Sequence, residues 1–161
     1  MNAGKWLQAN FAGYERLSRS EKTEIKDFPV LWSIFEMTAT MKRAKPQTII
    51  DAVDQIARPF RFDGPFLAAL DFYRDRFYRD GETTPYFDGL SLCRIARPLV
   101  LPVLTGEATR KRQKLTALLL IINRLRNNFL HGEKAEYAFE GQLGNFRHAN
   151  RTLMAAIPLW R

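Results

Sequence analysis

The stretch "LTALLLIINRLRNNFLHG" at residues 115–132 decides the fold, because the most apolar run of the chain passes here into a polar end. Its large apolar residues recur at spacings of three and four, which is the period of one face of an α-helix. They are Leu115, Leu118, Ile122, Leu125 and Phe129. The pattern predicts a long helix from about Glu107 to Leu130 that packs against other helices.

Further helices are expected on both sides of this one, from the same periodicity and from prolines placed at first turns. They are a segment with Leu7, Phe11, Tyr14 and Leu17 on one face, Val30–Met41 opened by Pro29, about Gln47–Ala57, a segment from Pro65 to the "RDG" at 79–81, and about Asn145–Trp160. Residues 81–106 contain several prolines and glycines, so turns or short helices are expected there in place of a strand. The sequence therefore predicts an all-α protein, one domain over residues 1–161, built as a helical bundle of about five to seven helices.

Composition and charge narrow the class of protein. The chain has 161 residues, of which 46% are hydrophobic and 26% charged, a globular profile. Its longest apolar run is too short to cross a membrane, no signal peptide is visible, and the single Cys93 cannot form an internal disulfide, so the cytoplasm is the expected location. The net charge of +8 favours polyanionic partners such as RNA, DNA or an acidic protein.

Common cofactor and nucleophile motifs are missing. The chain has two histidines, neither in a metal-binding spacing such as HExxH, and it contains no P-loop, GxGxxG or GxSxG sequence. We therefore expect no metal and no cofactor. If the protein is an enzyme, it should work with general acid–base groups and fixed cations.

Arg126 borders the apolar face of the long helix, about 60° from the centre of the stripe. Its guanidinium needs acceptors there, because an unpaired buried charge is costly. One interpretation is an ion pair with a carboxylate on a neighbouring helix, and the other is a site for an anion. His131 and Gly132 follow where the helix should end, a position that suits glycine and favours a cation by about 0.3–1 kcal/mol. On the simpler interpretation, Asn127 and Asn128 only finish the helix.

Taken together, Arg126, four intervening residues and His131, with the polar Asn127 directly after the arginine, resemble the signature of the HEPN superfamily. The resemblance implies a helical bundle that dimerises so that two copies of the motif face each other in a cleft. Many members are metal-independent endoribonucleases, frequently prokaryotic toxins or defence effectors against phage. It therefore implies RNA, a second copy of the chain and an antitoxin or regulatory protein as partners. Some HEPN toxins carry a tyrosine two residues after the histidine that an antitoxin modifies, and here that position is Glu133.

The resemblance also implies a role for each motif residue. RNA is cut when its 2′-OH attacks the adjacent phosphate, which leaves a 2′,3′-cyclic phosphate and a 5′-OH. Imidazole titrates near working pH, so His131 would act as general base or acid, with the second histidine supplied by the other copy. Arg126 would hold the scissile phosphate and stabilise the charge that develops on it. Asn127 would orient the histidine or donate to the phosphate.

A basic run on the same helix could track the RNA backbone towards the motif. The candidate RNA-binding residues are Arg110, Lys111, Arg112, Lys114, Arg124 and Lys134. The alternative is an ordinary solvated start of a helix. A second function also stays open: a non-catalytic HEPN-like module that binds RNA or an acidic protein, although such members often lack the arginine or the histidine. His148 matches no motif, and a surface position on the last helix is expected for it.

Overall fold

The computed structural model describes residues 2–11, 13–131 and 141–161. These residues form eight α-helices and a terminal 3₁₀ helix. Their only strands are two, of two residues each, and they pair as a β-hairpin. The elements are α1 (Ala3–Asn10), α2 (Arg19–Ala39), α3 (Pro46–Asp54), α4 (Pro65–Phe77), β1 (Tyr78–Arg79), β2 (Glu82–Thr83), α5 (Pro85–Gly89), α6 (Arg97–Thr105), α7 (Lys111–Leu130), α9 (Leu143–Ala156) and η1 (Ile157–Trp160). The prediction of a single all-α domain is confirmed, with more helices than the five to seven expected.

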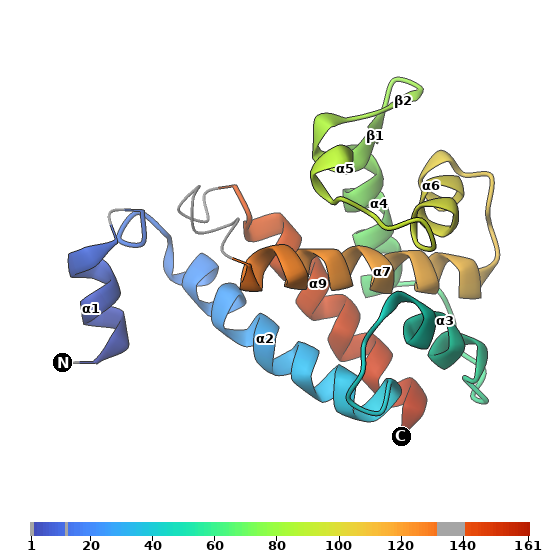
Figure 1. The fold of residues 1–161 in the computed structure, drawn as a ribbon, viewed down its shortest axis with the longest axis horizontal. Helices are drawn as coiled ribbons and strands as arrows, with labels where there is room; N and C mark the ends of the chain where they lie inside the picture. The colour runs from blue at the N-terminus through green and yellow to red at the C-terminus, as the bar shows by residue number, and fades with distance from the viewer. Residues whose placement is uncertain (1, 12, 132–140) are drawn as a thin grey trace.

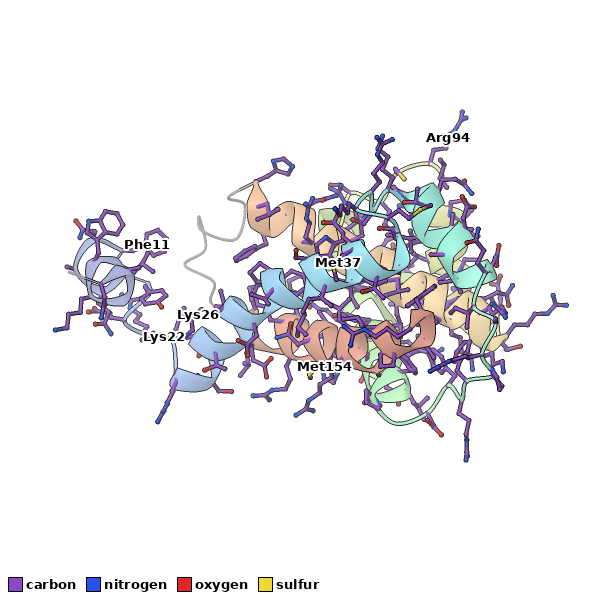
Figure 2. All side chains as sticks on the ribbon, turned by 90° about the horizontal axis from the view of Figure 1, so that it is seen from below. Phe11, Lys22, Lys26, Met37, Arg94 and Met154 are labelled. Atoms are coloured by element: carbon purple, nitrogen blue, oxygen red, sulfur yellow. The ribbon has the colours of Figure 1, made fainter. Side chains whose placement is uncertain are left out.

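Helix α7 is the centre of the bundle. It crosses the molecule with α3 and α6 packed along it, while α9 lies between α2 and α4 (Figure 1). Every residue from Leu115 to Asn123 is buried, so this part of α7 is enclosed on all sides and not only along the predicted stripe. A helix that is apolar all round belongs in a core. Helix α1, by contrast, has no buried residue and stands apart from the bundle in both views (Figures 1 and 2).

The start of α2 differs from the prediction. Pro29 was expected to open this helix but lies inside it, and the helical face expected to run on to Leu17 ends with α1 at Asn10. The reason is a capping box: the Ser18 hydroxyl accepts a 3.1 Å hydrogen bond from the Glu21 N–H, and the Glu21 carboxylate accepts a 2.8 Å bond from the Ser18 N–H. This pair fixes the helix start ten residues earlier. Pro29 is then tolerated, although it cannot donate the helical hydrogen bond of its position.

The segment between α4 and α7 is built from short elements. The run "RPLVLPVL" forms α6, with Pro98 in its first turn and Pro102 inside it, so a short helix is confirmed over a strand. The "RDG" segment, expected only to end the helix from Pro65, forms the turn of a β-hairpin that was not predicted. Asp80 and Gly81 both have positive φ, at 54° and 85°, as a two-residue hairpin turn with the twist of its strands requires.

An aromatic cluster fixes the carboxyl end of α7. Phe28 of α2, Phe129 of α7 and Phe146 of α9 meet edge to face, with ring centroids 5.3–6.3 Å apart. Such pairs add a stabilising contact beyond simple burial. The end of α7 that carries the motif is therefore held between the two longest neighbouring stretches of helix, α2 and α9.

Close packing of α9 on α4 gives a first prediction. A Cβ added at Gly144 would lie 2.6 Å from two ring atoms of Phe72, which stacks on His148 and cannot move without losing that contact. Overpacking costs about 1–3 kcal/mol, and the better helix propensity of alanine offsets about 0.5–1 kcal/mol of it. We expect Gly144→Ala to lower the free energy of unfolding by about 1 kcal/mol in urea titrations.

The matched control is Gly89→Ala, because nothing lies within 4 Å of a Cβ at that helical glycine. We expect this variant to be as stable as the wild type or slightly more stable. Equal stability of the Gly144→Ala protein and the control would show that the α4–α9 contact is looser than described here.

Candidate active site at the end of helix α7

The three motif residues lie at the end of the central helix. Arg126 and Asn127 belong to the last turns of α7, and His131 is the residue that caps it. The backbone N–H of His131 donates to the Asn127 carbonyl at 3.0 Å, which closes the helix. The imidazole is exposed, and no side-chain hydrogen bond reaches it from the part of the chain that the structure describes. His131 is therefore accessible to a substrate or to a second protein.

Arg126 is partly buried, and no carboxylate among the described residues forms an ion pair with it. One terminal nitrogen donates to the Asn127 side-chain oxygen at 3.0 Å, while Nε is buried and has no acceptor. The ion pairs found among the described residues join Arg61 to Asp63 and Arg147 to Glu24. The described residues therefore do not contain the ion pair that one interpretation expected between Arg126 and a carboxylate on a neighbouring helix. A guanidinium in this state stabilises an anion that comes within reach.

A hollow of about 240 Å³ lies beside Arg126, between α2 and α7. Its walls are mostly apolar, and its polar lining comes from a hydroxyl, a carboxylate and the arginine itself. The lining residues are Phe28, Pro29, Trp32, Ser33, Glu36, Arg126, Phe129 and Leu130. Glu36 shares this hollow with Arg126 but forms no ion pair with it. The hollow could not be predicted from the sequence, because its two walls are about ninety residues apart along the chain.

Arg124 and Asn128 act on the opposite flank of α7. Arg124 Nε donates to the Leu90 carbonyl at 2.7 Å, and its Nη2 donates to the Asn128 side-chain oxygen at 3.3 Å. Asn128 in turn donates to the Gly89 carbonyl at 3.2 Å. These bonds fasten the end of α5 to α7. Arg124, expected to bind RNA, thus already has its guanidinium occupied by internal acceptors.

Some cations at the start of α7 are also bound to internal acceptors, while others are not. Arg112 donates to the carbonyls of Ile56 at 2.7 Å, Asp54 at 3.3 Å and Val53, the last of which also accepts from the Ile56 N–H at 3.3 Å, so Arg112 caps the end of α3 and the turn that follows. Lys111 donates to the Phe60 carbonyl at 3.0 Å. Both side chains therefore hold the segment that follows α3.

The remaining cations of the run are freer to meet an anion. Lys114 lies over the Phe62 ring at 5.3 Å. Arg110 is exposed, and its side chain forms no hydrogen bond or ion pair with the described residues. Its backbone N–H is accepted by the Gln113 side chain at 3.2 Å, which starts α7 a few residues later than predicted. Lys134, also proposed to bind RNA, lies outside the described residues.

This division predicts different defects for two neighbouring arginines. Arg110→Ala should leave the free energy of unfolding within about 0.5 kcal/mol of wild type and, if RNA is bound here, lower the salt dependence of RNA binding by about one phosphate contact. Arg112→Ala should lower the free energy of unfolding by about 1–3 kcal/mol, because it removes the side-chain donor of the Asp54 and Ile56 carbonyls. Urea titrations and RNA binding at several salt concentrations measure both. Equal stability of the two variants would contradict the structural role of Arg112.

His148 is half-buried in α9 and not on the open surface as expected. Its ring stacks on Phe72, with centroids 4.5 Å apart and planes 15° from parallel. Burial lowers the pKa of His148, and the charges of Arg151 and Arg147 lower it further, while Glu24 of α2 opposes them. The neutral imidazole is thus a packing surface between α4 and α9, and it lies away from the motif.

The lowered pKa of His148 predicts a pH dependence of stability. Its folded pKa lies below the ordinary value of about 6.5, so between the two values the unfolded chain binds more protons and the native state loses stability as the pH falls. We expect the free energy of unfolding to drop more between pH 7.5 and pH 5.5 in the wild type than in His148→Gln. Urea titrations at the two pH values measure the difference, and parallel losses in both proteins would contradict it.

No helix in the described part of the chain is long and apolar enough to cross a membrane. Over the same residues, no three side chains among His, Cys, Asp and Glu come together as metal ligands do. Cys93 is free and exposed. Comparison of the chain with protein-family models, with curated proteins and with solved structures found no match. The HEPN resemblance therefore stays a prediction from the motif.

Proposed function

We propose that the protein is a metal-independent endoribonuclease of the HEPN type, whose active site is completed by a second copy of the chain. The observation that supports this most strongly is the state of Arg126: a partly buried guanidinium, held by Asn127 and without a carboxylate partner, one turn before an exposed His131. The structural arginines Arg112 and Arg124 each donate to internal oxygens through Nε or through both terminal nitrogens, whereas Arg126 has one such bond and leaves its buried Nε without an acceptor among the described residues.

The proposed reaction needs only the groups present. One His131 takes the proton from the 2′-OH of the RNA, whose oxygen then attacks the adjacent phosphorus and forms the 2′,3′-cyclic phosphate. The bond from phosphorus to the 5′ oxygen breaks, and the His131 of the second copy donates a proton to the leaving oxygen. Arg126 neutralises the charge on the phosphate oxygens as it builds up, and the hydrogen bond that it donates to the Asn127 side-chain oxygen keeps the guanidinium in place.

An apolar face on α2 supports the pairing of two chains. Val30 and Met37 are exposed and lie seven residues apart, so they share one side of the helix, and the exposed Met41 follows just beyond its end. Met37 points outward on this side (Figure 2). Leu130, at the end of α7, is also exposed and lines the hollow beside Arg126. Covering this face with the same face of a second copy would bring the two α7 ends towards each other.

Toxin or phage-defence activity, with an antitoxin or regulatory partner, is the biological setting that the resemblance suggests for such an enzyme. The competing function is a non-catalytic module that binds RNA or an acidic protein through the same basic surface.

The proposal is tested by incubating end-labelled tRNA and mRNA with wild type, Arg126→Ala and Arg94→Ala in excess EDTA. Arg94 is an exposed arginine between α5 and α6 and serves as the matched control (Figure 2). We expect wild type and Arg94→Ala to cut RNA and Arg126→Ala to be slower by about 10²–10³-fold, the usual cost of one transition-state donor. Salt-sensitive RNA binding without cutting by any of the three would instead support the binding module.

A further inference from the structure

Two buried donors without acceptors line the same hollow. Trp32 is 2% exposed, and neither its indole N–H nor the buried Nε of Arg126 has a hydrogen-bond partner among the described residues. Both side chains border the hollow of about 240 Å³ between α2 and α7. Buried N–H groups are almost always paired in folded proteins. Two exceptions on side chains that line one hollow indicate a site whose acceptor arrives with a ligand.

The rest of the hollow specifies the shape and polarity of that ligand. Pro29 and Phe129 are partly exposed and provide apolar walls, which suit a planar ring. Glu36 lies one helical turn after Trp32 on α2, and its carboxylate has no hydrogen bond or ion pair with the described residues. The volume is below the roughly 300–1,000 Å³ of sites for drug-sized molecules. The hollow therefore offers donors, one carboxylate acceptor and stacking surface to a single small ring system.

We propose that this hollow binds a guanine base of the RNA. Guanine presents the acceptors O6 and N7 together with an amino group that donates, and arginine commonly donates to O6 and N7. Arg126 and Trp32 would donate to the acceptor edge, and Glu36 would accept from N1–H and the amino group. Adenine has an amino group where guanine has O6. Its amino donor would therefore meet the N–H donors of Arg126 and Trp32, and no hydrogen bond could form there. The single-ring pyrimidines would leave stacking surface uncovered.

This inference rests on the proposed function, because it assigns the base beside the scissile phosphate that Arg126 holds. Cleavage next to guanosine would follow from it. Base binding, however, is measurable without any cleavage, so the two proposals can fail separately.

The direct test follows the indole N–H signals of the ¹⁵N-labelled full chain by NMR during titration with guanosine 5′-monophosphate. The chain has three tryptophans. Trp160 donates to the Ala52 carbonyl at 2.9 Å and is the internal control for a paired indole, Trp6 is exposed, and Trp32→Phe assigns the third signal. We expect guanosine monophosphate to shift the Trp32 signal in a saturable way and to leave the Trp160 signal unchanged. Adenosine 5′-monophosphate and inorganic phosphate, at equal concentrations, should not produce this shift.

Two variants sharpen the result. Glu36→Gln should weaken guanosine monophosphate binding by about tenfold, because the amide presents the ring with a donor and only one uncharged acceptor. Glu82→Gln, in the exposed hairpin, should bind as the wild type does. His131→Ala should also bind normally, since the imidazole does not line the hollow.

The proposal is overturned if guanosine monophosphate leaves the Trp32 signal unmoved, since the hollow then holds only water. It is overturned equally if adenosine monophosphate or phosphate alone produces the same shift. Loss of base binding in a protein that still cuts RNA would leave the nuclease intact and remove only the guanine site. Base binding by a protein that cuts no RNA would support the guanine site and remove the nuclease.

Discussion

Replacing His131 with alanine is expected to slow RNA cleavage by about 10²–10⁴-fold, which is the usual contribution of a general acid or base. The reason is that the chain has only two histidines, and the other one is a packing surface between α4 and α9. His131 caps α7 and is exposed, so its removal should cost little stability. Cleavage rates of a labelled RNA in excess EDTA, with thermal unfolding of each protein, measure both effects.

The matched control is His148→Gln, which removes the second imidazole and should cut RNA at close to the wild-type rate. Added imidazole should restore part of the activity of His131→Ala, because the missing group is a proton carrier and not a structural support. A His131→Ala protein that cuts as fast as wild type would exclude the proposed chemistry.

Phe28→Ala is expected to produce the largest loss of stability, about 3–5 kcal/mol in the free energy of unfolding. Phe28 is fully buried, and it contacts both Phe129 and Phe146 edge to face. Its removal would leave a cavity where α2, α7 and α9 meet and would free the end of α7 that carries the motif. Urea titrations followed by circular dichroism measure the loss.

The control is Trp6→Ala, which removes a larger aromatic side chain from α1, a helix without buried residues. We expect its effect to stay within about 0.5 kcal/mol. A Phe28→Ala protein no less stable than Trp6→Ala would mean that the three-ring cluster does not hold the bundle together.

The helical class of this protein could be predicted from local patterns. The run from Leu115 to Ile122 is apolar on every side, and tertiary packing then encloses it completely. Pro65 was predicted to open a helix and lies in the first turn of α4. Where the prediction was wrong, two local signals competed. At α2 the Ser18–Glu21 capping box outweighed Pro29 as a starting signal, because it pairs two N–H groups that the helix end would otherwise leave free.

The site could be predicted only along one helix. The spacing of Arg126, Asn127 and His131 placed all three at the end of α7, and the structure agrees with that position. The roles of Arg112 and Arg124 could not be predicted, since their acceptors lie on segments that only the fold brings near, at residues 53–56 and at Leu90. The hollow beside Arg126 was missed for the same reason.

The chemistry of the RNA ends formed in excess EDTA distinguishes metal-independent attack by the 2′-OH from other routes of cleavage. Fragments produced by purified wild type would be separated, and their ends identified by phosphatase and kinase treatment and by mass spectrometry. We expect wild type to form 2′,3′-cyclic phosphates and 5′-hydroxyls. Arg126→Ala and His131→Ala should form them much more slowly. Fragments with 3′-hydroxyls and 5′-phosphates, or cutting that stops when EDTA is added, would contradict the proposed reaction.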